Sequence, residues 1–162
     1  MRPPNGLAEI NATFGNIAHY IQPDGTLSPD WEESIISLIQ LPYPMTLAWD
    51  KTKQVTHMRC HKLMMPIFSD VFSQILRQGL SSLASLFGGC FMYRPERASH
   101  RLSVHSWGIA IDLNPETNKM GTVGDMDPRV ISIFKSAGFT WGGDFVDQDR
   151  KDPMHFQFCS GY

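Results

Sequence analysis

The sequence SVHSWGIAIDL, residues 103–113, decides the fold of the C-terminal half of this chain. Residues 108–113 are a short apolar run interrupted by one carboxylate, a pattern that indicates a buried strand. Successive side chains of a strand point to opposite faces, so Ala110 and Asp112 should face away from Ile109 and Ile111. Burying a carboxylate is costly unless a cation or a metal ion pairs with it. Asp112 is therefore the first candidate for a functional site.

Two histidines are placed to reach this carboxylate. His105 lies in the turn before the strand, and Gly108 lets the backbone fold so that the imidazole returns toward Asp112. Near the C-terminus, the sequence DPMH opens a further expected strand, with His155 at its start. Two imidazoles and one carboxylate are a three-ligand set, and catalytic zinc takes three protein ligands and an open position.

Such a centre also needs a carboxylate that does not bind the metal. Zinc makes water a nucleophile near neutral pH, and a general base must accept the proton of that water. Asp152 lies three residues before His155, close in sequence to one ligand but distinct from it. The pattern predicts Asp152 as this base.

The remaining sequence predicts an α+β fold, because helices come first and strands with one intervening helix follow. We expect one domain over residues 1–162, with a small antiparallel sheet that carries the zinc site and helices packed around it. Residues 1–60 should hold an irregular arm (1–25), a helix and a hairpin, and residues 88–158 should form the zinc-site core. The expected helices are 28–40, stopped by Pro42 and Pro44; 66–79, with an extension toward residue 89; and 127–138. The expected strands are 45–49 and 54–58, joined by a turn at 50–53, then 90–93, 108–113 and 155–158.

Composition narrows the class of protein. The chain has 162 residues, of which 42% are hydrophobic and 19% charged, enough to bury one core. A formal net charge of −2 argues against nucleic acid as a partner. The sequence has no run of 18 apolar residues, so we expect no insertion into a membrane. No apolar segment of the kind found in a secretory signal follows the N-terminus. Three cysteines without CxxC spacing indicate reduced thiols. We therefore expect a monomer made in a cytoplasm.

The motifs resemble a known family. Ser103, His105, Gly108, Ala110 and Asp112, together with WGGD at 141–144 and D-x-x-H-F at 152–156, are similar to the zinc D-alanyl-D-alanine carboxypeptidase/L-alanyl-D-glutamate peptidase family. The similarity covers about residues 88–158. Members cut the stem peptides of peptidoglycan, and many are bacteriophage endolysins.

The resemblance implies a role for each matching residue. His105, Asp112 and His155 would bind one zinc ion per chain, and Asp152 would be the general base. Arg94, in the sequence YRP, would hold the developing oxyanion, a task that suits its fixed charge. Ser103 would help to orient the substrate. The chain departs from the family at Gln157, where a glutamate is common.

Other residues leave alternatives open. Trp107 and Trp141 could wall the cleft and bind substrate, or could simply pack in the core. The acidic run Asp144, Asp147 and Asp149 is either a solvated loop or a site for a second cation; it lacks the glycine and distal glutamate of an EF-hand.

The predicted function is a zinc-dependent peptidoglycan peptidase, a phage-type endolysin that cuts the L-Ala–D-Glu bond. It would be made in the host cytoplasm without a signal peptide and would act on the cell wall after release. One alternative is a D-Ala–D-Ala carboxypeptidase. Another is a catalytically silent zinc module that binds a peptide or protein, although the presence of Asp152 and Arg94 argues against silence.

Overall fold

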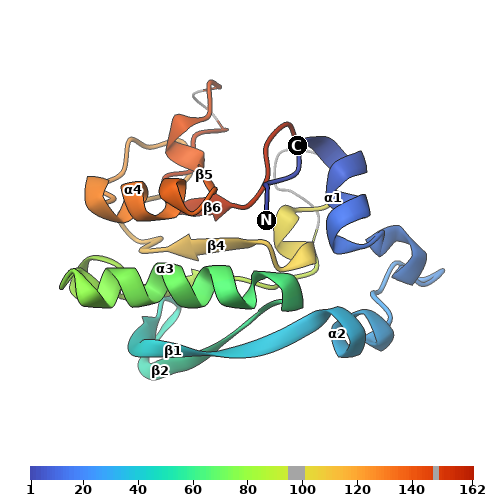
Figure 1. Ribbon diagram of the computed structural model, residues 1–162, viewed down its shortest axis with the longest axis horizontal. Helices are drawn as coiled ribbons and strands as arrows, with labels where there is room; N and C mark the ends of the chain where they lie inside the picture. The colour runs from blue at the N-terminus through green and yellow to red at the C-terminus, as the bar shows by residue number, and fades with distance from the viewer. Residues whose placement is uncertain (95–100, 148–149) are drawn as a thin grey trace.

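A computed structural model describes residues 1–94, 101–147 and 150–162. Its centre is a six-stranded sheet in the order β2-β1-β3-β4-β6-β5. The strands are β1 (Ile36–Leu47), β2 (Asp50–His61), β3 (Leu86–Gly89), β4 (Ala110–Leu113), β5 (Thr140–Trp141) and β6 (His155–Gln157). The α-helices are α1 (Gly6–Phe14), α2 (Pro29–Ile35), α3 (Met65–Arg77) and α4 (Pro128–Ser136). Figure 1 shows α3 and α4 on the same face of this sheet.

The sheet is mixed, which corrects the expected antiparallel sheet. β1 and β3 are parallel, with Thr46 opposite Leu86, whereas the other neighbouring pairs are antiparallel. Parallel neighbours need a crossover connection, usually through a helix. The hairpin β1–β2 is followed by α3, which carries the chain back so that β3 pairs with β1. The α+β class and the single domain are confirmed.

The N-terminal segment is ordered structure, so the expected irregular arm at 1–25 was wrong. It forms α1 and a 3₁₀ turn at Ile17–Tyr20. Ile10, Phe14 and Ile17 are buried in the main core. Ile10 and Phe14 have the i, i+4 spacing of one face of a helix, a signal hidden in the sequence by the surrounding Pro, Gly and Asn.

The helix expected at 28–40 is only half as long. It begins as predicted, since the Ser28 side chain caps it by accepting from the Asp30 N–H, but it ends at Ile35. From there β1 alternates, with residues 39, 41, 43 and 45 buried and residues 38, 40, 42 and 44 exposed. Pro42 and Pro44 thus lie within the strand, where its pairing with β2 shifts between Gln40 and Met45.

The hairpin is confirmed, but its turn lies at residues 48–49 and not at 50–53, which belong to β2. The helix from Pro66 is confirmed as α3. Its expected extension was wrong, because residues 81–83 form a 3₁₀ turn and β3 follows. Residues 90–93, expected as a strand, lie just after β3, since the pairing with β1 ends at Phe87 and the pairing with β4 ends at Gly89.

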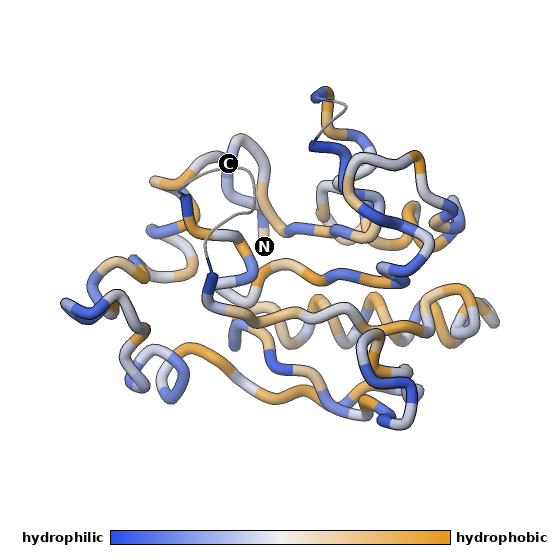
Figure 2. Tube along the Cα trace, turned by 180° about the vertical axis from the view of Figure 1, so that it is seen from behind, coloured by the Kyte–Doolittle hydropathy of each residue, from blue (hydrophilic) through white to orange (hydrophobic). Residues whose placement is uncertain are grey.

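The C-terminal half matches its prediction most closely. β4, α4 and β6 lie where the sequence places them, and Asp127 caps α4 by accepting from the Arg129 N–H at 2.9 Å. Phe134 of α4 stacks on Phe156 of β6 with ring centroids 4.2 Å apart. This contact fixes α4 against the strand that carries His155. Figure 2 shows the hydrophobic residues gathered along the strands and α3.

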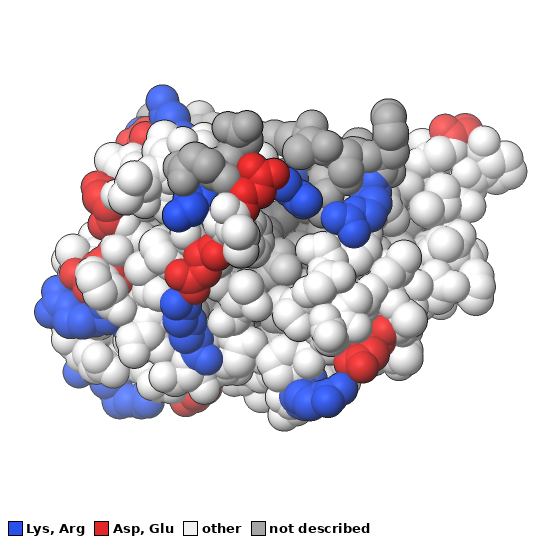
Figure 3. All heavy atoms as spheres, turned by 90° about the horizontal axis from the view of Figure 1, so that it is seen from above, with Lys and Arg blue, Asp and Glu red and all other residues white. Residues whose placement is uncertain are grey.

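In the described part of the chain, the surface charges, the helices and the cysteines do not indicate a second functional site. Acidic and basic side chains are interspersed over the face seen in Figure 3. None of the described helices is long and apolar enough to cross a membrane. Cys60, Cys90 and Cys159 are buried free thiols, and burial raises the pKa of Cys60 and Cys159 to about 12.

Candidate metal centre

Two antiparallel strands bring the first pair of candidate ligands together. Asp112 of β4 is the cross-strand partner of His155 of β6. His155 follows a tight turn in which its N–H donates to the Asp152 carbonyl at 2.9 Å. The pairing explains why a carboxylate and an imidazole 43 positions apart in the sequence share one face.

His105 reaches the same place from a 3₁₀ turn, Val104–Trp107, directly before β4. The Ser103 hydroxyl caps this turn by accepting from the His105 N–H. Gly108 ends it in the left-handed region, with φ of 68°, and an added Cβ would lie 2.6 Å from the His61 backbone nitrogen. A side chain is therefore excluded at residue 108 both by conformation and by space.

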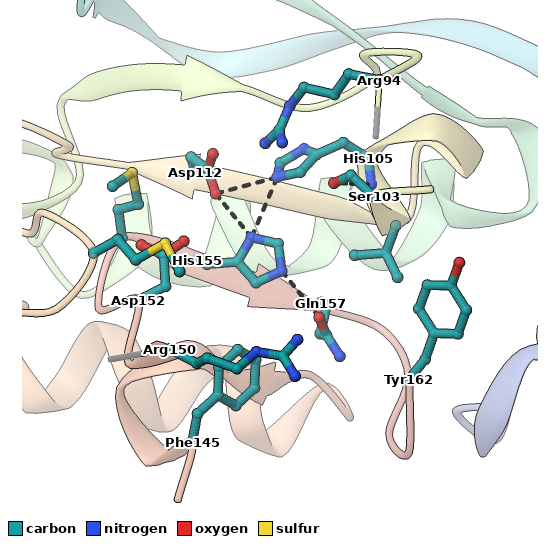
Figure 4. A pocket seen from close by; sticks show the side chains of 13 residues that line it. Arg94, Ser103, His105, Asp112, Phe145, Arg150, Asp152, His155, Gln157 and Tyr162 are labelled. Atoms are coloured by element: carbon teal, nitrogen blue, oxygen red, sulfur yellow. Dashed lines mark hydrogen bonds and ion pairs between the residues drawn. The ribbon is translucent and has the colours of Figure 1, made fainter. Parts of the chain in front are cut away.

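Three side-chain atoms converge. His105 Nε2 lies 3.2 Å from Asp112 Oδ1 and 3.2 Å from His155 Nδ1, and the last two atoms are 2.9 Å apart. Figure 4 shows the three side chains pointing toward one another. Among the described residues, this is the group of histidine, cysteine and carboxylate side chains that could hold a metal ion.

The surroundings determine which ring nitrogen faces the centre. His105 Nδ1 lies 2.7 Å from the Cys90 carbonyl oxygen, which can only accept, so Nδ1 carries the hydrogen. His155 Nε2 lies 3.0 Å from Gln157 Oε1. The Gln157 amide nitrogen donates in turn to the Cys159 carbonyl, so its oxygen faces the imidazole. His105 Nε2 and His155 Nδ1 are therefore left with lone pairs directed inward.

This arrangement fits zinc. Three lone-pair atoms at such short separations repel one another unless a cation lies between them. With zinc bonds of about 2.0–2.2 Å, ligand atoms of a tetrahedral site lie roughly 3.3–3.6 Å apart, close to the separations here. The hydrogen bonds to Cys90 and Gln157 are the outer contacts that orient metal-ligating histidines.

The electrostatics agree with a cation site. Burial raises the pKa of the Asp112 carboxyl, but the neighbouring His105 and His155 outweigh burial and hold the pKa well below its usual range. For His155, burial lowers the pKa, whereas the hydrogen bond and charge of Asp112 and the charge of Asp152 raise it above its ordinary value. The Asp112 side chain is 14% exposed, so the centre opens to solvent at the carboxylate.

Asp152 lies beside the three-atom group but is not part of it. It lines the same pocket and lies next to His155 in Figure 4. Its N–H donates to the Gly142 carbonyl at 3.0 Å, and a Cβ on Gly142 would lie 2.3 Å from the Asp152 carbonyl oxygen. The glycine of the WGGD sequence thus lets the segment carrying Asp152 approach closely.

Arg94 and Ser103 also line the pocket, on the side of His105. The Arg94 backbone is held by the Ser106 hydroxyl, which accepts from its N–H, and by the Ser103 N–H, which donates to its carbonyl. These bonds tie the residue expected at the oxyanion to the turn that carries His105.

Trp107 and Trp141, the two tryptophans expected to bind substrate, do not line the pocket of the candidate metal centre. Trp107 is 1% exposed, and its indole N–H donates to the Gly15 carbonyl. The Trp141 indole N–H donates to the Pro153 carbonyl. Both support the segments that carry ligands, in line with the core-packing alternative.

The acidic run does not gather around a cation within the described residues. Asp144 forms an ion pair with Lys135 at 2.5 Å, and Asp147 accepts the Arg150 N–H through its backbone carbonyl. Asp149 lies outside the described residues.

Sequence reasoning missed several residues that shape the pocket. The Cys90 carbonyl and Gln157 orient the two imidazoles. The lining is completed by Val104, Met120, Phe145, Arg150, Met154 and Tyr162. The backbone carbonyl has no sequence signal, but a polar residue two positions after His155, on the same face of the strand, could have indicated Gln157.

The pocket thus holds two histidines and one carboxylate that could bind a metal ion, with the carboxylate of Asp152 beside them. Catalytic zinc uses ligand sets of this kind. Residues 97–158 match the protein family described as D-alanyl-D-alanine carboxypeptidase. This segment contains β4, α4, β6 and all three candidate ligands, so the resemblance drawn from the motifs is confirmed and the segment is similar to a peptidase. No curated protein and no solved structure matches the chain significantly.

Proposed function

We propose that the chain is a zinc-dependent peptidase that hydrolyses the L-Ala–D-Glu bond of peptidoglycan stem peptides. The observation that supports it best is the convergence of His105, Asp112 and His155 lone pairs within a segment that matches a peptidase family. One zinc ion per chain fits this donor set.

Each nearby side chain then has a chemical task. A zinc ion bound there would supply Lewis acidity at the scissile carbonyl and lower the pKa of the attacking water. Asp152 accepts a proton from that water and delivers it to the amine nitrogen that leaves. The Arg94 guanidinium lies on the His105 side of the pocket, where its charge stabilises the oxyanion.

Ser103 can orient the substrate. Its oxygen accepts from the His105 N–H, and its hydroxyl hydrogen has no acceptor among the described residues. The hydroxyl can therefore donate to a backbone carbonyl of a bound peptide, so that one side chain both caps the turn and contacts the substrate.

The choice of bond rests on Asp152. An aspartate at this position resembles the phage-type L-Ala–D-Glu endopeptidases, which supports a lytic enzyme. We further propose that the enzyme is made in a host cytoplasm, acts on the wall after release and works as a monomer. The alternative, a D-Ala–D-Ala carboxypeptidase, is favoured by the description of the matched family.

Digestion of defined muropeptides followed by mass spectrometry tests the proposal. Cleavage between L-Ala and D-Glu, abolished by a chelator and restored by zinc, is the expected result. Loss of only the terminal D-Ala would establish the carboxypeptidase. Zinc binding without cleavage of either bond would establish a silent module. A lytic endopeptidase should also clear suspensions of cells with a permeabilised outer membrane, which a carboxypeptidase cannot do.

A further inference from the structure

A second hollow continues from the pocket of the candidate metal centre. The two share Asp112, Met120 and Met154. Beyond these residues the second hollow is lined by Trp49 from the β1–β2 turn and by the loop after β4, including Glu116 and Lys119. A substrate held at Asp112 can therefore extend into this hollow without leaving the surface.

Trp49 is the unusual residue of the hollow. It is 64% exposed, whereas Trp31 and Trp107 are buried in the core. None of the described residues accepts a hydrogen bond from its indole nitrogen. The turn that carries Trp49 is nevertheless fixed, because the Ala48 N–H donates to the Phe87 carbonyl of β3 at 3.0 Å. A large aromatic side chain is thus held beside the pocket without a packing role.

The rim of the hollow is polar. Glu116 is held by an ion pair with Lys51 at 2.8 Å. The Lys119 ammonium has no carboxylate partner among the described residues. An aromatic surface bordered by hydrogen-bonding groups suits a ligand with one apolar face and polar edges, which is the character of an amino-sugar ring.

The spacing agrees with a sugar near the scissile bond. β1 and β4 are separated by β3, and two strand spacings of about 4.8 Å place the end of β1 roughly 10 Å from Asp112. In peptidoglycan, one alanyl and one lactyl unit separate the L-Ala–D-Glu bond from the sugar, about 7 Å at 3.5 Å per unit. From the D-Ala–D-Ala bond the sugar is more than twice as far.

We propose that Trp49 and this hollow bind the N-acetylated amino sugar attached to the stem peptide, so that the enzyme prefers saccharide-linked substrates. This inference rests on the proposed L-Ala–D-Glu activity. Arg150 lines the pocket but not this hollow, so its charge can then pair with the glutamate carboxylate of the substrate.

The test compares two substrates with one peptide sequence, a disaccharide-tetrapeptide and the free tetrapeptide. The wild type should show the higher kcat/KM on the disaccharide-tetrapeptide. Trp49→Ala should reduce this preference about tenfold, equivalent to about 1.4 kcal/mol, with unchanged zinc content. Leu38→Ala is the matched control, because Leu38 is 59% exposed on the same hairpin but does not line the hollow. It should keep the wild-type preference.

A second measurement does not depend on cleavage. Titration with the disaccharide alone should change the tryptophan fluorescence of the wild type and of Leu38→Ala, but not of Trp49→Ala. The saccharide site would be excluded if the disaccharide did not change the fluorescence of the wild type. It would also be excluded if Trp49→Ala lowered kcat/KM equally on both substrates. If the wild type cleaves neither substrate but the disaccharide response depends on Trp49, the proposed activity fails and the sugar site stands.

Discussion

Polar side chains face solvent at one end of the sheet and are buried at the other. At the hairpin end, β1 alternates between buried and exposed residues, and the charged side chains of β2, such as Lys51 and Arg59, face solvent. At the site end, all residues of β6 are buried, and β4 is buried except for the partly exposed Asp112. Yet this end carries the imidazole of His155 and the amide of Gln157.

The difference shows at which end of the sheet polar side chains are buried for function at a cost in folding free energy. A polar group that faces water loses little on folding, but a buried one must find a partner. His105 Nδ1 and the Gln157 amide nitrogen donate to backbone carbonyls, and His155 Nε2 donates to Gln157. The inward-facing atoms of His105, Asp112 and His155 are left for a metal ion. Substitutions of these polar side chains at the site end should therefore reduce metal binding or activity, whereas substitutions at the hairpin end, away from Trp49, should mainly change stability.

The largest effect is expected from the ligands. His105→Ala or Asp112→Asn should lose both zinc and activity, because two remaining donors, or a neutral amide, hold the metal poorly. Elemental analysis and activity measured on the same preparations check this. If either variant kept the zinc content of the wild type, the substituted residue would not be a zinc ligand, and the site end of the sheet would not be organised around a metal.

Asp152→Asn should lower activity by roughly 10²–10⁴-fold, the usual contribution of a positioned general base. The variant keeps the size of the side chain, so its zinc content should remain that of the wild type. The two asparagine variants form a matched pair. If Asp152→Asn loses the metal and Asp112→Asn keeps it, the roles of the two carboxylates are reversed.

The sequence predicted the site end well because its signals are local. The sequence itself shows a carboxylate within an apolar strand, one histidine in the turn before that strand and another at the start of a later strand. None of these signals requires knowledge of which strands pair. β4, β6, α3, α4 and the cap Asp127 follow in the same way from periodicity and end signals.

The hairpin end was harder to predict because its structure depends on distant partners. Leu38 and Ile39 continue the helical stripe of Trp31 and Ile35 as well as they fit a strand, and only pairing with β2 selects the strand from Ile36 onward. The parallel β1–β3 pair depends on where α3 returns the chain. The ring nitrogens that face the metal centre depend on Gln157 and on the Cys90 carbonyl, and the contact of that backbone carbonyl has no sequence signal.

A smaller loss is expected for Arg94→Ala. Removing one oxyanion donor should reduce turnover by roughly 10²–10³-fold, with unchanged zinc content. Arg94→Lys should recover only part of this, because an ammonium lacks the planar fork of a guanidinium. Turnover near that of the wild type in the alanine variant would exclude Arg94 from the oxyanion role.

Gln157→Leu tests the outer contact of His155. It removes the acceptor for the imidazole N–H and should weaken zinc affinity by about 10–100-fold, as for other residues that orient metal ligands. Competition with a zinc chelator of known affinity measures this. Gln157→Glu is the matched variant and should retain or strengthen binding; an unchanged affinity in the leucine variant would mean that packing alone orients His155.

The smallest effect on activity is expected at His61, where β2 ends and the two regions meet. Its imidazole lies 3.0 Å from the Phe14 carbonyl and accepts the Leu63 N–H, so it is buried in the neutral form. Burial lowers its pKa from 6.5 to about 4. Between these two values the unfolded chain binds a proton that the native protein does not, so the free energy of unfolding should decrease as the pH falls from 6.5 to 4. At about 1.4 kcal/mol per pKa unit, this contribution reaches about 3 kcal/mol.

His61→Gln separates this contribution from that of the metal centre. Glutamine can still donate to the Phe14 carbonyl but does not titrate, so the variant should lose less stability on acidification than the wild type does. Urea unfolding at several pH values between 4 and 7 gives the two slopes, and zinc loss in acid affects both proteins alike. At pH 7 the variant should keep its zinc and most of its activity. Identical slopes would mean that His61 does not carry this acid sensitivity, and a loss of zinc at pH 7 would mean that this end of the hairpin is part of the site.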